Sequence, residues 1–227
     1  MSTSIQMFEA VQSGDVASVI SLLDADPDLV NAKNEKGVSA VLLATYFGQR
    51  EIAEVLLARG AELNIFEAAA VGNLDRIKTL VAENEGLINS HSSDGFTALG
   101  LAAFFGRKEV LNFLLAHGAN PNAASENQMR VMPLHSAVAH RQPEIATAMV
   151  ESLLLNGAEV NSAQDGGWTP LHQAAAHGQI EIIKLLLEHK ANVNSKSDDG
   201  TTPLQMAQNK GYFEAAELLV RRNDAGS

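Results

Sequence analysis

The chain of 227 residues is 46% hydrophobic and 19% charged, which is ordinary for a globular protein in water. Acidic residues outnumber basic residues by 27 to 16, and the net charge of −11 disfavours nucleic-acid binding, which usually needs a basic patch. The lack of cysteine excludes disulfides, a thiolate nucleophile and thiol-ligated metals.

Neither a membrane-spanning segment nor a secretory signal is predicted. No apolar run approaches the roughly 18 residues needed to cross a bilayer. The N-terminal stretch carries Glu9 and Asp15 and has no basic residue before Lys33, whereas a secretory signal starts with positive charge. We therefore expect a cytoplasmic protein that does not bind membranes.

A repeated pattern runs through the chain. An alanine followed four residues later by a turn glycine recurs at Gly14, Gly48, Gly72, Gly106, Gly178 and Gly211, and Arg141 takes the glycine's place in one unit. This spacing gives seven units of roughly 33 residues, and a fixed period of this length indicates a solenoid. The predicted units span residues 3–33, 34–64, 65–91, 92–122, 123–161, 162–194 and 195–224 of a single domain over residues 1–227.

The unit from Thr169 to Asn194, TPLHQAAAHGQIEIIKLLLEHKANVN, predicts two helices. The first helix starts at the Thr–Pro pair and carries one apolar stripe. Gly178 ends it, because glycine accepts the left-handed conformation of a C-terminal cap. The second helix is apolar over most of its circumference and must pack between neighbours. A polar turn, SKSDDG, follows before the next unit.

The motif TPLHxAAxxGxxEIxxLLLxxxAxVN resembles the ankyrin repeat, with looser copies at residues 39–42, 97–100, 132–135 and 202–205. The resemblance covers nearly the whole chain. It implies an all-α solenoid of stacked helix-turn-helix units with β-hairpin fingers. Fingers and first helices would line a concave side, and second helices a convex side.

Three departures from the pattern follow in chain order. Residues 7–64 and 65–122 align without a gap, which suggests a duplicated two-repeat block, as in bacterial ankyrin proteins. The third unit follows Asn64 directly, so we expect the finger before it to be missing. In the fifth unit, four extra residues make about one helical turn, and we predict a long second helix from Pro143 to Leu155.

The histidines have a structural explanation. His135 and His172 fill the last position of the TPLH motif, where the resemblance implies an imidazole hydrogen-bonded to turn backbone. His140 and His177 lie five residues further on, which does not place two ligands on one helical face. Motifs for zinc, phosphate binding and nucleophilic catalysis are also missing. We expect no metal, no cofactor and no catalytic site.

Bulky side chains at two kinds of position have no role in the repeat itself. The resemblance implies that the residue before the TPLH-type motif and the residue two before the turn glycine face the concave side. Such side chains are typical of binding hot spots, and the predicted partner site consists of Val38, Tyr46, Phe96, Phe104 and Trp168. Phe47 and Phe105 are expected to wedge between repeats. The loop of residues 122–131, with Met129 and Arg130, either covers the aromatic side chains or leaves them open.

We expect a non-enzymatic, monomeric module that binds a basic or neutral protein partner along its concave surface. The alternative is a regulatory or inhibitory subunit of a specific enzyme. An enzyme with an unrecognised site is less favoured, because it would need a deep pocket with a perturbed acid–base pair.

Overall fold

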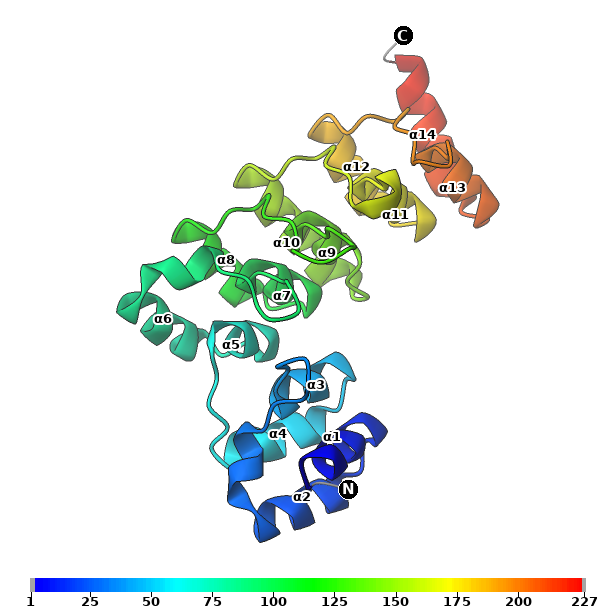
Figure 1. Ribbon diagram of the computed structural model, residues 1–227. Coiled ribbons are helices and arrows are strands. Elements are labelled where there is room, and N and C mark those ends of the chain that lie inside the picture. The colour runs from blue at the N-terminus through cyan, green and yellow to red at the C-terminus, as the bar shows by residue number, and fades with distance from the viewer. Residues whose placement is uncertain (1–2, 226–227) are drawn as a thin grey trace.

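The computed structural model describes residues 3–225, which form a curved row of helix pairs (Figure 1). The inner helices are α1 (Thr3–Ser13), α3 (Ala40–Tyr46), α5 (Ile65–Val71), α7 (Ala98–Phe104), α9 (Pro133–Val138), α11 (Pro170–Ala176) and α13 (Pro203–Asn209). The outer helices are α2 (Val16–Ala25), α4 (Arg50–Ala58), α6 (Leu74–Glu83), α8 (Lys108–Ala116), α10 (Pro143–Leu155), α12 (Ile180–Glu188) and α14 (Phe213–Ala225). Short 3-10 turns, η1 (Pro27–Asn31), η2 (Glu85–Asn89) and η3 (Asp165–Gly167), lie in the connections. The predicted all-α solenoid is confirmed.

Small side chains let the inner helices pack closely. The alanine that precedes each turn by four residues is completely buried in six of the repeats, at Ala44, Ala68, Ala102, Ala137, Ala174 and Ala207. Each inner helix packs against the next, as α7 does on α9 and α11 does on α13. Since each repeat buries its apolar surface mainly on its neighbours, stability accumulates along the row.

The turns after the inner helices follow the predicted chemistry with one exception. Gly72 and Gly178 take left-handed conformations, with φ of 88° and 64°. Over residues 3–225, the non-glycine residues with positive φ are Arg130 and Lys190, so Arg141 does not replace glycine in conformation. The α9 helix has six residues instead of the seven of α7, and a wider bend leads into α10.

Asparagine and histidine side chains tie one repeat to the next. Asn161 Oδ1 accepts a hydrogen bond from Asn192 N (2.8 Å), and its Nδ2 donates to the Lys190 carbonyl (3.2 Å). His135 Nε2 donates to the Trp168 carbonyl at 3.1 Å. His172 Nε2 donates in the same way to the Thr201 carbonyl at 3.0 Å. The structural role that the resemblance implies for His135 and His172 is therefore confirmed.

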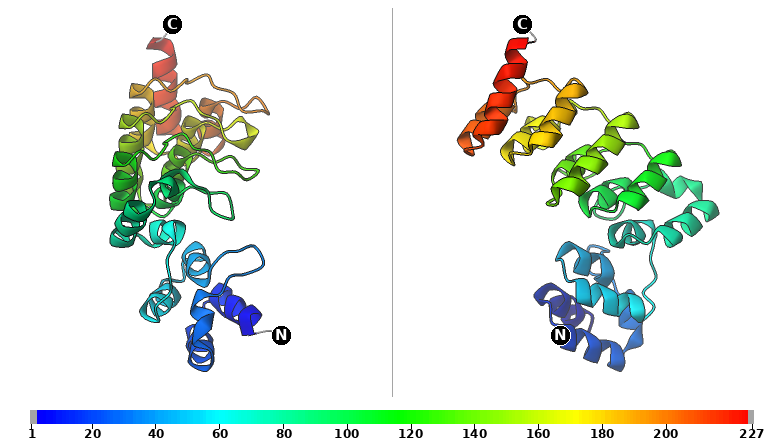
Figure 2. Two further views of the ribbon diagram at one scale, coloured as in Figure 1. Left: turned by 60° about the vertical axis from the view of Figure 1, so that its left-hand side comes forward. Right: turned by 180° about the vertical axis from the view of Figure 1, so that it is seen from behind.

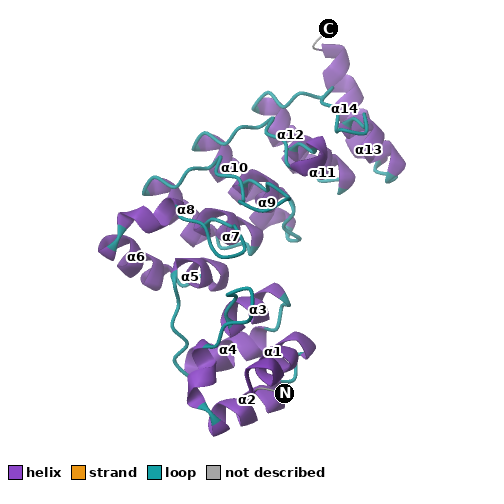
Figure 3. Ribbon diagram, in the orientation of Figure 1, coloured by secondary structure: helices purple, strands orange, loops and turns teal. Residues whose placement is uncertain are grey.

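The fingers contain little regular strand pairing. Over residues 3–225 the chain is helix and loop (Figure 3), and the only extended pairing is two isolated bridges, Lys33 with Ser39 and His91 with Thr97. The other fingers are held by turns and side-chain hydrogen bonds. No helix in this range is both long and apolar enough to traverse a lipid bilayer.

The predicted gap in the row of fingers lies between α4 and α5. The chain passes directly from one repeat to the next there, whereas the other connecting loops project to one side (Figure 2). Asn64 accepts hydrogen bonds from Phe66 N and Glu67 N, and Glu67 bonds back to Asn64 N, so Asn64 caps α5 instead of bridging repeats. The prediction of an extended outer helix is also confirmed, because α10 spans Pro143–Leu155.

Candidate partner-binding groove

A hollow of about 320 Å³ lies on the inner face of α7 and α9, and we call it the aromatic pocket. Its apolar wall consists of Tyr46 at the end of α3, Phe96 before α7, Phe104 at the end of α7, and Met129 and Val131 of the α8–α9 loop. The pocket thus draws its wall from several repeats.

A hydrogen bond from the end of α3 to the loop before α7 fixes Tyr46 in place. Its hydroxyl donates to Asp94 Oδ2 at 2.7 Å, and its ring lies 5.4 Å from the Phe105 ring. Burial, followed by the hydrogen bond and charge of Asp94, raises the pKa of the Tyr46 phenol above its ordinary value. Tyr46 therefore remains a neutral donor that closes one end of the pocket.

The α8–α9 loop lines the aromatic pocket with Met129 and Val131 and leaves the Phe104 ring open to solvent. Asn127 Nδ2 donates to the Asp94 carbonyl (3.0 Å) and Asp165 N to the Met129 carbonyl (3.1 Å), so both neighbouring fingers hold the loop. Phe104 is 47% exposed and Met129 is 54% exposed. Of the two alternatives for this loop, the structure therefore shows the open one at Phe104, whereas Tyr46 and Phe96 are partly buried.

A second hollow of about 270 Å³, the tryptophan pocket, continues along the inner face toward α13. Trp168 packs edge-on against His172, with ring centroids 5.4 Å apart, and Met206 and Ala176 complete the apolar lining. Gln164 and Gln173 line both pockets. We call the two pockets together the concave groove.

Small residues beside large ones create these hollows. The positions two residues before the turn glycine, or its substitute Arg141, carry Phe104 in α7 but only Ala139 and Ala176 in the next two repeats. Ala139 lines the aromatic pocket and Ala176 the tryptophan pocket. The large rings therefore stand at the edges of spaces that the alanines leave empty.

The histidines under the groove are neutral at pH 7. Burial lowers the pKa of His135 to about 4, although hydrogen bonds to backbone carbonyls act in the opposite direction. Burial also lowers the pKa of His172, whose Nδ1 caps α11 through Thr169. Over residues 3–225, no three His, Asp or Glu side chains are grouped so as to hold a metal ion.

The structure brings four of the five predicted site residues to the groove. Tyr46, Phe96 and Phe104 share the aromatic pocket, and Trp168 lies in the tryptophan pocket. Val38 is only 8% exposed and lines neither pocket, because it is packed into the core under the first finger. Its burial removes it from the candidate surface.

The two neighbouring phenylalanines differ in placement. Phe105 packs against the core, and its ring lies 5.4 Å from the ring of Tyr46 in another repeat, as a wedge between repeats should. Phe47 is 53% exposed, so the expectation that it wedges between repeats is wrong.

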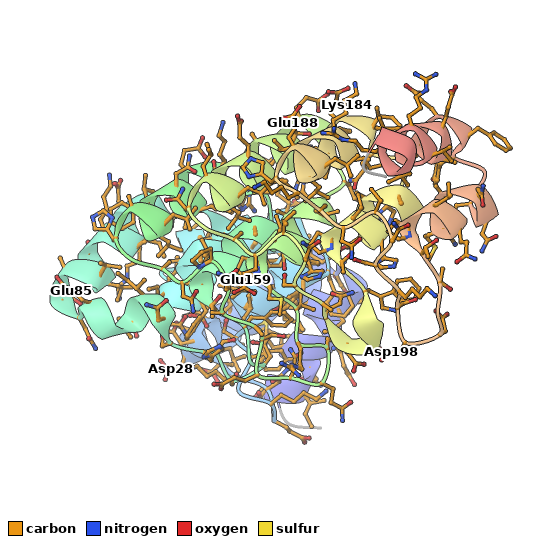
Figure 4. The ribbon with its side chains drawn as sticks, turned by 90° about the horizontal axis from the view of Figure 1, so that it is seen from above. Asp28, Glu85, Glu159, Lys184, Glu188 and Asp198 are labelled. Atoms are coloured by element: carbon orange, nitrogen blue, oxygen red, sulfur yellow. The ribbon has the colours of Figure 1, made fainter. Side chains whose placement is uncertain are left out.

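A larger hollow of about 600 Å³ lies on the convex side between α10 and α12. Glu144, Glu151 and Glu181 line it, and Glu181 is paired with Lys184 at 2.7 Å. In the view from above, Lys184 lies on one edge of the array and Asp198, before α13, on another (Figure 4). This convex hollow has exposed carboxylates, whereas the concave groove has aromatic rings.

A family model described as "Ankyrin repeats (3 copies)" matches residues 65–152 and 146–226, which together are more than half of the chain. The chain belongs to the ankyrin-repeat family. Ankyrin repeats indicate a protein–protein interaction module. The matched region starts at Ile65, directly after the missing finger.

Proteins from a plant, a bird and a yeast resemble the chain. "Probable E3 ubiquitin-protein ligase XBOS32" of Oryza sativa subsp. japonica is 28% identical over 81% of this chain and 37% of its own length. "Nuclear factor NF-kappa-B p105 subunit" of Gallus gallus is 29% identical over 74% of this chain and 18% of its own length. "Probable 26S proteasome regulatory subunit p28" of Saccharomyces cerevisiae is 28% identical over 80% of this chain and 83% of its own length.

The chain spans little more than a third of the length of the first relatives, at 37%, 35% and 36%. The relatives named above come from a plant, a bird and a yeast, so they lend no support to the expected bacterial origin.

Two groove residues, Gln173 and Met206, are not predicted from the sequence. Val131 holds the concave position before the TPLH-type motif, although it is not among the five predicted site residues. Gln173 and Met206 share one position, directly after the TPLH-type motif, which Leu101 and Ser136 hold in other repeats. That position is apolar in some repeats and polar in others, so it has no sequence signal of its own.

Proposed function

We propose that the chain is a non-enzymatic module that binds a partner protein along the concave groove. The observation that carries this proposal is the exposure of Phe104 and Met129 at the mouth of the aromatic pocket. Large apolar side chains that stay in contact with water around a hollow are typical of interaction sites. Trp168 extends the same surface into the next repeat.

Hydrogen bonds within the chain hold the concave groove in a preformed shape. Asp94 holds Tyr46, and the neighbouring fingers hold the α8–α9 loop. A preformed surface loses less conformational entropy on binding, which favours affinity. The net charge of −11 favours a partner with a basic or neutral surface.

The titratable groups with shifted pKa values in the groove support a binding role over catalysis. Tyr46, His135 and His172 are each engaged in hydrogen bonds that hold repeats together. Their pKa shifts follow mainly from burial in these structural positions. We propose that the module acts as a monomer, which light scattering coupled to size-exclusion chromatography would test.

The direct test is Phe104→Ala with Trp168→Ala in one variant. The matched control is Leu155→Ala with Phe213→Ala, because these exposed apolar side chains line neither pocket. We expect the groove variant to lose at least about tenfold of its capture of the natural partner from lysate, since hot-spot truncations commonly cost 2 kcal/mol or more. The control should bind normally. A large drop in melting temperature, or unchanged capture, would contradict the proposal.

A second candidate function is regulation of a specific enzyme. The observation that favours it is the yeast relative, whose name includes "regulatory subunit" and of whose length 83% is covered. Mass spectrometry of the captured partner, followed by an activity assay with equimolar chain, tests this candidate. A partner without enzymatic activity, or one whose rate does not change, would exclude it.

A further inference from the structure

A hollow of about 450 Å³ lies where the repeat of α3 and α4 meets the repeat of α5 and α6, and we call it the junction pocket. Its wall comes from α4, from the turn between α3 and α4, from Val71 at the end of α5, and from Arg107 directly before α8. None of these residues lines either pocket of the concave groove. The junction pocket is therefore a separate place on the molecule.

The junction pocket coincides with two departures from the repeat pattern. The finger before α5 is missing, and α4 and α6 pack less closely than the other neighbouring outer helices of residues 3–225 (Figure 1). Ala53 and Leu57 of α4 line the pocket and are only partly buried. Their counterparts in the duplicated block, Leu111 and Leu115, are 0% and 8% exposed. A smaller side chain and looser packing thus leave a space that the second block fills.

Arg107 brings an uncompensated cation to the junction pocket. Its Nε donates to the Ala70 carbonyl at 2.8 Å, but its guanidinium forms no ion pair with the described part of the chain. Gln49 and Gln179 hold the same place after the turn glycine in other repeats. Gln179 makes the same kind of bond, to the Val138 carbonyl at 2.9 Å. A neutral glutamine therefore suffices for the structural bond, and the charge of Arg107 needs another explanation.

Arg50 supplies a second cation from α4. Its Nε is paired with Glu54 Oε1 at 2.8 Å, and within the described residues both this guanidinium and that of Arg107 keep their Nη groups unengaged. Burial, and then the charge of Arg50, lowers the pKa of the Arg107 guanidinium. The two cations are thus close enough to repel each other, while the carboxylate of Glu54 pairs with Arg50 alone.

Two guanidinium groups with unengaged Nη donors match the chemistry of a phosphate group. Each can donate parallel hydrogen bonds to an oxyanion. A phosphate monoester offers three strong acceptor oxygens and a charge of about −1.5 to −2 at pH 7, so it can engage both cations. The pocket volume lies within the range of small-molecule sites, about 300–1,000 Å³, and Ala53, Leu57 and Val71 give it an apolar wall. The fitting ligand therefore carries an apolar group beside its phosphate.

We propose that the junction pocket binds a phosphate monoester that carries an apolar group. The phosphate lies between Arg50 and Arg107, and the apolar group lies against Leu57 and Val71. Because Arg50 precedes the missing finger and Arg107 follows it, the bound ligand links α1–α4 to the rest of the array. The net charge of −11 repels anions at long range, so binding depends on these local contacts. This inference does not depend on partner binding in the concave groove.

Calorimetric titration with phenyl phosphate tests the contact with Arg107. We expect the native chain to bind one equivalent, more tightly than inorganic phosphate. Arg107→Gln, which copies Gln49 and keeps a donor for Ala70, should weaken binding at least about tenfold, because charge-assisted hydrogen bonds are lost. The matched control, Lys108→Gln, removes an exposed cation outside the pocket and should bind normally. Equal weakening in both variants, or no binding by the native chain, would overturn the inference.

Glu54→Gln should change the affinity in the opposite direction. This substitution releases Arg50 from its ion pair and removes a negative charge from the pocket, so phenyl phosphate should bind about two- to fivefold more tightly. An exposed ion pair contributes little to stability, and the melting temperature should hardly change. Weaker or unchanged binding would contradict a phosphate between Arg50 and Arg107.

The phosphate group can belong to a free small molecule or to a phosphorylated side chain of another protein, and two probes distinguish these sources. Phenyl phosphate represents the first source, and a seven-residue peptide with a central phosphotyrosine among alanines represents the second. Tighter binding of the peptide would assign the site to a phosphorylated protein, and weaker binding to a small molecule. Failure of both probes would overturn the inference.

Hydrogen exchange tests the link across the junction. Separate opening of α1–α4 would carry Arg50 away from Arg107, so the ligand should oppose it. At a concentration of ten times Kd, phenyl phosphate should slow exchange in α1–α4 about tenfold by mass action. The same concentration should have no such effect on Arg107→Gln. Unchanged exchange in the native chain would overturn the link between the two parts, and the proposed function of the concave groove would stand.

Discussion

Two junctions between repeats, one before α5 and one before α11, join helices of the same type by different means. Before α11, Gln179 Nε2 reaches back to the Val138 carbonyl (2.9 Å), His135 bonds the next finger, and the outer helices α10 and α12 pack together. Before α5, the finger is missing and Asn64 caps a helix instead of bridging. The inner helices α3 and α5 still pack there.

The comparison shows that a finger couples repeats as well as presenting side chains. Without it, the junction before α5 depends on the inner helices, on a bond from Arg76 Nε to the Leu63 carbonyl (2.9 Å), and on the Tyr46–Asp94 bond. In a solenoid, folding cooperativity passes through nearest-neighbour interfaces. We therefore expect α1–α4 to open separately from the repeats that follow.

The largest expected effect comes from a matched pair of core truncations. Leu56 in α4 and Leu114 in α8 occupy the same place in the duplicated block, and both are completely buried. Each substitution by alanine should cost about 2–5 kcal/mol of unfolding free energy. In hydrogen exchange, Leu56→Ala should raise rates in α1–α4 alone, whereas Leu114→Ala should affect α5–α10. Equal spread along the whole array in both variants would show that the junction before α5 is as strong as the others.

A fall in pH should destabilise the junction before α11, because His135 becomes protonated there. His135 has a pKa lowered to about 4 in the folded chain, against an ordinary value near 6.5, so its contribution is complete above about pH 6.5 and is lost as the pH falls toward 4. The shifted pKa of His135 accounts for at most about 3 kcal/mol of the pH-dependent free energy of unfolding. His135→Gln, which copies Gln205 of the last repeat, should flatten the fall in stability measured by urea unfolding between these pH values. If the free energy of unfolding of His135→Gln falls with pH as steeply as that of the native chain, other groups cause the loss of stability in acid.

A smaller loss of stability is expected from a substitution at the junction before α5. Tyr46→Phe removes the hydrogen bond to Asp94 and should cost about 1 kcal/mol. Because the chain has no cysteine, spin labels can be placed at will. The distance distribution between labels at Glu51 and Asp75 should broaden in this variant.

The control for this measurement is a second pair of labels, at Glu109 and Glu144 of α8 and α10, which should be unaffected. Broadening at both pairs would indicate general loosening of the array instead of a local clamp.

The sequence predicted those features that one repeat determines. The length of α10 followed from a four-residue insertion, and the missing finger from the position of Asn64. Phe104 could be placed on the groove because its position in the repeat faces inward. These properties depend on local periodicity and on the turn chemistry of a single unit.

Features that depend on several repeats could not be predicted in this way. Whether Gln173 Oε1 finds a partner depends on side chains from neighbouring helices, and Met129 comes from a loop held by two different fingers. Val38 was misplaced for the same reason, since its burial depends on how the first finger folds onto the core. Tertiary contacts decide these cases.

The central claim, that the partner binds in the concave groove, is tested most directly by site-specific photo-crosslinking. A photoreactive phenylalanine analogue is placed at Phe104, at Met129, or at the exposed convex position Leu155, and the chain is illuminated in the presence of its captured partner. We expect covalent products at Phe104 and Met129 and none at Leu155. Products at Leu155, with none at the two groove positions, would contradict the account.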